Sequence, residues 1–257
     1  MKAAHATRTQ AERADQTRAN ILAAAVSQFS ENGLVGARME QIAEAAGVNK
    51  ALLYYYFRSK DDLYEAALES VAEGVRSSSM AVLEGKATAG ERFLLSTLNH
   101  FDRIHTNRGF QCLMQQEMIR LHRGEAGALS PLVKTVFRPL VERMQKVLEE
   151  GIATGELIAA DPSQIRYAAL GANVLYFLSA PLMHLIQGSD PLERRALELR
   201  RTSAIHYLGL ALFTNRKQGA KVARRVLDAT PMPESGGILP RMTPQSRSKK
   251  KQKVRRK

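Results

Sequence analysis

A short stretch of the sequence concentrates side chains that donate hydrogen bonds or carry positive charge. Residues 49–60 contain Asn49, Lys50, three consecutive tyrosines and Lys60. Lysine can donate to O6 and N7 of guanine, and a methyl group such as that of Ala51 can contact a thymine methyl group. Lysine and tyrosine donors can also bind phosphate oxygens. The stretch therefore favours non-covalent recognition of a nucleic acid.

The flanking residues predict the elements that would position these side chains. A first short helix has one apolar face, formed by Met39, Ile42, Ala43 and Ala46. Gly47 can end that helix in the left-handed conformation, and Asn49 is a favoured N-cap for a second helix. This order predicts a helix-turn-helix, whose second helix lies in the DNA major groove.

The second helix would bury Leu52, Leu53 and Phe57 and expose Lys50, Ala51, Tyr54, Tyr55 and Tyr56. The six apolar or aromatic residues 52–57 also fit a buried strand. Helix signals on both sides decide for the helix, since the chain offers no second strand for pairing. The capping pattern at residues 59–62 begins a longer helix over residues 60–84.

This stretch resembles the DNA-binding domain of the tetracycline-repressor (TetR) family. The matching residues are Gly33, Ile42-Ala43, Ala46-Gly47-Val48, Leu53-Tyr54, Phe57, Lys60 and Leu63. Two positions depart from the family pattern. Arg38 stands where a threonine usually caps the first short helix, and Tyr56 stands in place of the usual histidine. The resemblance implies an all-α fold, with a helix-turn-helix domain followed by a helical domain for effector binding and dimerisation.

By this resemblance, Lys50 and Ala51 would contact base edges. Tyr54, Tyr55, Tyr56 and Lys60 would bind phosphates, and Tyr55 could also contact a base. Arg38 and Gln41 are weaker candidates, because a charged or polar residue on a helix face is most often simply solvated. The candidate DNA-binding residues are Arg38, Gln41, Asn49, Lys50, Ala51, Tyr54, Tyr55, Tyr56 and Lys60. Burial of the Tyr54 ring with only its hydroxyl at the surface is the alternative for that residue.

We divide the chain into four parts. Residues 1–14 would form a flexible arm, residues 15–62 the DNA-binding domain, residues 63–214 the helical domain, and residues 215–257 a basic, largely disordered tail. Most of the formal net charge of +13 lies in this tail, where fourteen Lys or Arg face only Asp228 and Glu234. A disordered cationic segment can strengthen non-specific DNA binding, contact RNA or anionic lipid, or only solubilise the protein.

Further helices are predicted over residues 87–108, 110–122, 131–154, 162–187 and 191–214, with Pro139 forcing a kink or a broken start. In the TetR family the last two long helices pair with the same two of a second subunit. Residues 167–187 carry no formal charge and include small residues that permit close helix approach. A transmembrane span is the alternative, but polar residues such as Asn173 and His184 make a buried dimer interface the better reading.

The family usually binds a small molecule inside its helical domain, and the ligand changes the separation of the two DNA-reading heads. Candidate lining residues are Phe101, His105, Met114, Met118, Phe137, Met144, Asn173 and Phe177. Large apolar residues on helices are more often simple core. A Met-rich lining would suit an apolar or aromatic effector.

Other chemistry is not indicated. The single cysteine, Cys112, excludes an internal disulfide framework and has only Arg108 nearby to stabilise a thiolate, so an inert thiol is favoured over a redox sensor. The six histidines lack metal-ligand spacing, and no nucleophile, phosphate-loop or dinucleotide motif occurs. We therefore expect no metal, no cofactor and no enzyme activity, and a cytoplasmic, nucleoid-associated location, since the N-terminus has no apolar signal segment.

The sequence predicts a homodimeric transcriptional regulator, most simply a repressor, that leaves a palindromic operator when a small effector binds. The alternative is a TetR-like architectural or nucleoid-associated protein that acts through its basic tail and a protein partner.

Overall fold

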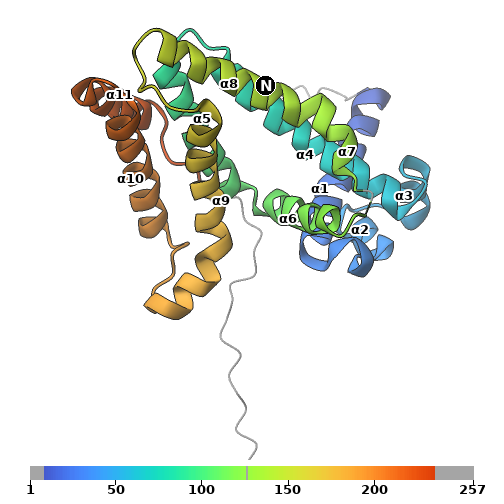
Figure 1. Ribbon diagram of the computed structural model, residues 1–257. Coiled ribbons are helices and arrows are strands. Elements are labelled where there is room, and N and C mark those ends of the chain that lie inside the picture. Colours follow the sequence, from blue (N-terminus) through green and yellow to red (C-terminus); the bar gives the residue numbers. More distant parts are fainter. Residues whose placement is uncertain (1–8, 126, 235–257) are drawn as a thin grey trace, which may run out of the picture.

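The computed structural model describes residues 9–125 and 127–234. In these two ranges the only extended pairing is an isolated antiparallel bridge between Leu157 and Phe213. The helices are α1 (Gln10–Gly36), α2 (Met39–Ala45), α3 (Lys50–Tyr56), α4 (Lys60–Leu83), α5 (Ala89–Thr106), α6 (Arg108–His122), α7 (Leu129–Leu132), the π-helical segment η1 (Val133–Phe137), α8 (Arg138–Ala153), α9 (Pro162–Gln187), α10 (Arg194–Leu212) and α11 (Arg216–Ala229). The predicted all-α fold is confirmed (Figure 1).

The first four helices build a head at one end of the molecule (Figure 1). Its core is formed by apolar residues of α1 to α4, among them Ile21, Phe29, Ile42, Leu53, Phe57, Leu63 and Leu68. α4 then leaves the head and runs beside α8 into the body. Because α4 contributes residues to the cores of both parts, the head and the body share one continuous helix.

The first helix begins earlier than predicted. We expected its start near Asp15, but α1 begins at Gln10, and Thr9 and Glu12 form a reciprocal capping box at its start. Two orphan backbone N–H groups are satisfied there, which stabilises the extra turn. Residues 10–14 are therefore helical rather than part of a flexible arm, and residues 1–8 lie outside the described residues. Gly33 breaks the helix with φ +67°, although a further turn follows it.

The body packs α5 in the middle of α4, α8, α9, α10 and α11. Phe93, Leu94 and Leu98 of α5 are almost fully buried in its core. Asn107 separates α5 from α6, because its side chain accepts a hydrogen bond from the Phe110 backbone nitrogen at 3.1 Å. The break between these helices therefore falls at Asn107 and not at Gly109, where the sequence placed it.

Pro139 has the predicted effect on its helix. The residue stands in the first turn of α8, directly after the π-helical segment η1. Proline has no N–H to donate to the preceding turn, and a π turn is one way in which a helix absorbs such a missing bond.

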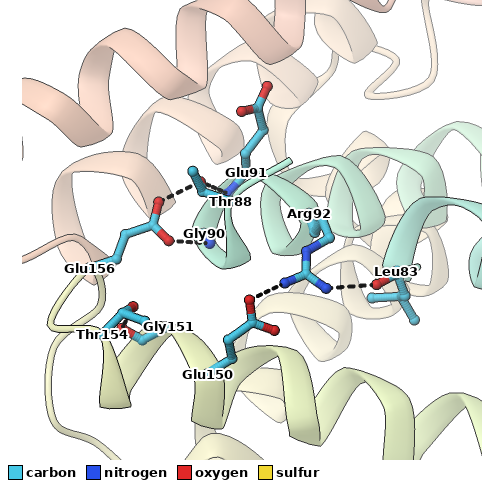
Figure 2. A network of polar contacts seen from close by, with 9 residues as sticks. All are labelled: Leu83, Thr88, Gly90, Glu91, Arg92, Glu150, Gly151, Thr154 and Glu156. Carbon is cyan, nitrogen blue, oxygen red and sulfur yellow. Dashed lines mark hydrogen bonds and ion pairs between the residues drawn. The ribbon is translucent and has the colours of Figure 1, made fainter. Parts of the chain in front are cut away.

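A polar network joins α5 to α8 and to the turn that follows α8 (Figure 2). The buried Arg92 side chain donates to the Leu83 carbonyl oxygen at 3.0 Å and to the Glu150 carboxylate at 2.6 Å. Glu156 accepts from the Gly90 backbone nitrogen at 2.9 Å and from the Thr88 hydroxyl at 2.6 Å, at the N-terminus of α5. A carboxylate at a helix N-terminus is favourable because orphan N–H groups point at it. The network fixes the position of α5, which lines the cavity described below.

The C-terminal part differs from the prediction in two ways. α10 begins at Arg194 and not at Pro191, because Glu193 is its N-cap residue and residues 191–193 form a turn. The expected disordered tail from residue 215 is wrong for its first part, since residues 216–229 form α11. One face of this helix buries Gly219, Val222, Ala223 and Val226 against the body. Residues 235–257, with most of the basic run, lie outside the described residues.

α9 and α10 lie on the side of the molecule away from α3 (Figure 1), and both helices expose large apolar side chains. Its residues include Tyr167, Leu175, Leu178, Leu182, Leu185 and Ile186 of α9, and Leu199, Tyr207 and Leu210 of α10. By length and composition, α9 is also the one helix among the described residues that could cross a membrane. Large exposed apolar side chains on neighbouring helices are typical of an interaction surface.

Candidate DNA-binding surface and effector cavity

The turn between α2 and α3 has the geometry of a helix-turn-helix. Gly47 adopts φ +68°, and the Asn49 side chain caps α3 by accepting a hydrogen bond from the Leu52 backbone nitrogen at 2.7 Å. Leu53 and Phe57 are buried, which anchors one side of α3 to the head. Leu52, predicted to be buried, is 36% exposed and lies at the edge of the packed side.

The opposite side of α3 is open to solvent. Tyr55 is 81% exposed and Tyr54 is 42% exposed, so the Tyr54 ring is only partly covered. Of the nine candidate residues, seven are exposed: Arg38, Gln41, Asn49, Lys50, Ala51, Tyr54 and Tyr55. The structure thus brings most of the predicted DNA-binding residues onto one accessible surface formed by α2 and α3.

Glu40 of α2 is a member of this surface that the sequence reading missed. Its carboxylate forms an exposed ion pair with the Lys50 ammonium group. The hydrogen bond from Lys50 lowers the pKa of Glu40, and the same hydrogen bond raises the pKa of Lys50. Both groups are therefore charged at neutral pH, and a base edge that Lys50 contacted would have to displace the Glu40 carboxylate.

Tyr56 and Lys60 have partners within the head. The Lys60 ammonium group donates to the carbonyl oxygens of Val35 at 3.1 Å and Ala37 at 3.3 Å. The Tyr56 hydroxyl donates to the Ala14 carbonyl oxygen at 3.3 Å. Both residues therefore tie the segment around α3 to the two ends of α1, in addition to any phosphate contact. Arg38 makes no side-chain cap at the start of α2, in line with the missing threonine.

A cavity of about 480 Å³ lies within the body, between α4, α5, α6, η1, α8 and α9. Four of the predicted ligand residues line it: Met114, Met118, Phe137 and Met144. Apolar side chains such as Leu140, Leu170 and Val174 complete most of its wall. A cavity of this size and lining is typical of a small-molecule site.

The other four predicted ligand residues do not line this cavity. Phe101 and Phe177 pack on each other with ring centroids 5.0 Å apart. His105 is buried, and Asn173 donates to the Thr97 carbonyl oxygen at 3.1 Å. Phe101 and His105 of α5, and Asn173 and Phe177 of α9, therefore point away from the cavity. They stabilise the packing of α5 against its neighbours.

The sequence reading missed the polar lining residues. His100, Arg103 and Arg166 border the cavity. Burial, with a smaller contribution from the Arg103 charge, lowers the pKa of His100 to about 3, so its ring is neutral at physiological pH. The spacing of His100, Arg103 and Asn107 places them on one side of a helix, which is the sequence signal that could have predicted a polar part of the wall.

The single cysteine, Cys112, is half-buried on α6. Burial raises the pKa of the Cys112 thiol, which keeps it protonated. In the part of the chain that the structure describes, no three His, Cys, Asp or Glu side chains gather in a way that could hold a metal ion.

The α4–α6 contact connects the head to the cavity. The Tyr64 hydroxyl of α4 donates to the Glu117 carboxylate of α6 at 2.9 Å, and Arg120 donates to the same oxygen at 2.8 Å. Glu117 is fully buried, and burial raises the pKa of Tyr64. Since α6 also carries Met114, one helix contacts both the cavity and the head.

Two family models match the chain. Residues 21–67 match the family described as bacterial regulatory proteins, tetR family, and residues 96–207 match the tetracyclin repressor-like C-terminal domain. The first match covers the helix-turn-helix, and the second covers the helices around the cavity.

Curated proteins and solved structures agree with these models. The chain is 48% identical over 65 residues to the HTH-type transcriptional repressor NicS of Pseudomonas putida, a match that covers 25% of this chain and spans only 31% of NicS. It is 28% identical over 175 residues to the HTH-type transcriptional regulator RutR of Escherichia coli, which covers 66% of this chain and 77% of RutR. A TetR/AcrR-family regulator structure from Thermobifida fusca aligns with a TM-score of 0.55 at 25% identity, covering 74% of this chain and 95% of that one. The chain therefore belongs to the TetR family of bacterial transcriptional regulators.

Proposed function

We propose that the protein is a homodimeric repressor that binds a palindromic operator through α3 and leaves it when a small molecule fills the body cavity. The observation that carries this proposal is the solvent-open side of α3, where Lys50, Ala51, Tyr54 and Tyr55 stand exposed on a helix that Leu53 and Phe57 hold in place. On this proposal the protein acts in the cytoplasm by binding DNA and carries out no reaction of its own.

The exposed apolar surface of α9 and α10 supports a dimer. Leu185 is 81% exposed and Leu199 is 68% exposed, and a second copy would remove such side chains from water. A symmetric dimer presents two α3 helices, and two half-sites about one DNA turn apart, or a multiple of it, would form an inverted repeat.

The position of α6 supports the coupling between effector and DNA. A ligand that moves the cavity wall at Met114 would also move Glu117, which holds Tyr64 of α4. The ligand can shift the head spacing only by its difference in affinity for the two spacings.

The test is selection of binding sites from random duplex DNA at about 0.15 M salt, a fixed value because affinity depends steeply on salt. The full-length chain and a chain ending at Glu234, which keeps α11, are compared, together with Lys50→Ala and the control Lys86→Ala. We expect one inverted repeat for both lengths, relaxed at one position of each half-site by Lys50→Ala and unchanged by Lys86→Ala. Binding without a motif, and only by the full-length chain, would instead support the architectural alternative and overturn the repressor proposal.

A further inference from the structure

The cavity wall carries two positive charges and no negative one. Arg103 of α5 and Arg166 of α9 are its charged members, and among the described residues that line it there is no Asp or Glu. The remaining polar groups, such as Ser79 and Asn107, are neutral, as is His100 with its lowered pKa. The cavity wall is therefore apolar over most of its area and positively charged at the two arginines.

Among the described residues the partly buried Arg103 has no carboxylate partner, unlike the buried Arg92 and Arg201. Arg201 makes two hydrogen bonds to the Asp102 carboxylate, at 2.7 and 2.8 Å, and Arg92 pairs with Glu150 at 2.6 Å. Arg103 instead donates to the neutral Ser79 hydroxyl at 3.1 Å. Burial lowers the pKa of Arg103 to about 10, so the guanidinium is still charged at pH 7. A partly buried charge without a counter-ion is unfavourable, and a bound anion would reduce that cost.

Arg166 has spare hydrogen-bonding capacity at the same cavity. Its Nε atom is buried and makes no hydrogen bond to the described residues. The guanidinium carbon lies 4.5 Å from the centre of the Tyr167 ring, a contact that holds the side chain without neutralising its charge. Two guanidinium groups, on α5 and α9, thus offer N–H donors that the described residues do not satisfy.

We propose that the effector is an organic anion with an apolar body, whose negative group binds Arg103 and Arg166 while the body contacts Met114, Phe137, Met144 and Leu170. This inference rests on the proposed role of the cavity as the effector site and adds the chemical class of the ligand. Arginine suits this task because its planar donors match oxyanions in a bidentate way. The apolar wall then selects against small hydrated anions, which cannot bury enough apolar surface to enter.

Two fluorescent probes that share one ring system test the proposal. 8-Anilinonaphthalene-1-sulfonate carries the anion, and N-phenyl-1-naphthylamine lacks it. Both are titrated into the full-length protein at about 0.15 M salt, where exposed charges are largely screened. We expect the sulfonate to bind more tightly, and Arg103→Met to weaken its binding at least tenfold, or about 1.4 kcal/mol. Binding of the naphthylamine should change less than twofold in the same variant.

Further variants separate the possible causes. Arg103→Lys should recover part of the sulfonate affinity, because it restores a charge without the planar fork. Arg166→Met gives a second reading should Arg103→Met fail to fold, and Arg224→Met is a matched control on the exposed side of α11. Leu170→Trp fills the cavity and should abolish binding of both probes.

The outcomes distinguish the two proposals. Equal affinity for both probes in the wild type, with no effect of either arginine variant, would overturn the anion inference while leaving the cavity as a ligand site. Probe binding that Leu170→Trp leaves unchanged would show that the cavity takes no ligand, which would overturn the effector role as well. DNA binding is measured separately by site selection and is independent of either result.

Discussion

The protonation state of His100 is set by the groups around it. Its Nδ1 atom lies 3.4 Å from the Asn173 amide nitrogen, a contact that requires Nδ1 to be unprotonated. Burial and the Arg103 charge lower the pKa of His100 from 6.5 to about 3. The residue thus stays neutral in the folded protein at pH values where the unfolded chain binds a proton.

This difference predicts a pH dependence of stability. Between pH 6.5 and 3 the unfolded state binds one proton more at His100 than the folded state, so acidification favours unfolding. The stabilising effect of neutral His100 is fully present above pH 6.5 and is lost as the pH falls, by no more than about 1.4 kcal/mol per pH unit. Urea unfolding at pH 7.5, 6.5 and 5.5 should show the wild type losing its advantage over His100→Gln as the pH falls. His122→Gln, an exposed control on α6, should track the wild type, and a constant difference between His100→Gln and wild type would contradict the assignment.

At the scale of elements, the contact between α10 and α11 depends on two glycines. A Cβ atom on Gly209 would lie 2.6 Å from the Gly219 carbonyl oxygen, and a Cβ atom on Gly219 would overlap the Gly209 carbonyl oxygen. Two helix backbones can approach this closely only where neither has a side chain. The crossing point therefore fixes α11 against the body.

We predict that Gly219→Ala destabilises the protein by about 1–3 kcal/mol, because an added methyl group overpacks this crossing. Gly74→Ala is the matched control, since Gly74 lies within α4 and a Cβ atom there would meet nothing within 4 Å. That change should instead stabilise the protein by about 0.5–1 kcal/mol through the better helix propensity of alanine. Urea unfolding of the three proteins at one concentration measures both effects. Equal stability of Gly219→Ala and wild type would show that α11 is not held at this crossing.

The same helix shows the limit of prediction from sequence. N-caps and glycine turns depend only on nearby residues. The starts of α3 after Asn49 and of α9 at Pro162 were therefore predicted correctly. α11 was missed because its charge density suggested disorder, although its apolar residues 219, 222, 223 and 226 follow helical spacing. The cavity charges were missed for a different reason. Whether an arginine has a counter-ion depends on which helices meet, and that is set by tertiary packing.

At the scale of the whole molecule, the exposed apolar surface of α9 and α10 raises the question of what covers it. α9 is apolar enough to span a membrane, and only 17% of its most apolar 18-residue stretch is buried within the chain. A dimer and a membrane would both cover this surface, but they differ in what they do to the polar side chains along it. The His184 Nδ1 atom can contact the Ser189 carbonyl oxygen, 3.1 Å away near the end of α9, only as a donor, and such a polar group fits a protein interface better than the hydrocarbon of a membrane.

We therefore predict that Leu185→Lys converts the dimer to monomers and weakens operator binding at least tenfold. In a symmetric dimer the lysine ammonium group would be buried in the interface without a counter-ion. Burial of such a charge costs much more free energy than leaving it in water. Sedimentation velocity reports the mass, and a duplex carrying the selected inverted repeat reports DNA binding. Leu121→Lys, the same substitution at an exposed position of α6, should leave the mass and the DNA binding unchanged. The prediction is contradicted if Leu185→Lys stays dimeric. It is also contradicted if the wild type is a monomer that floats with anionic vesicles in a density gradient, because the surface would then bind lipid and not a second copy.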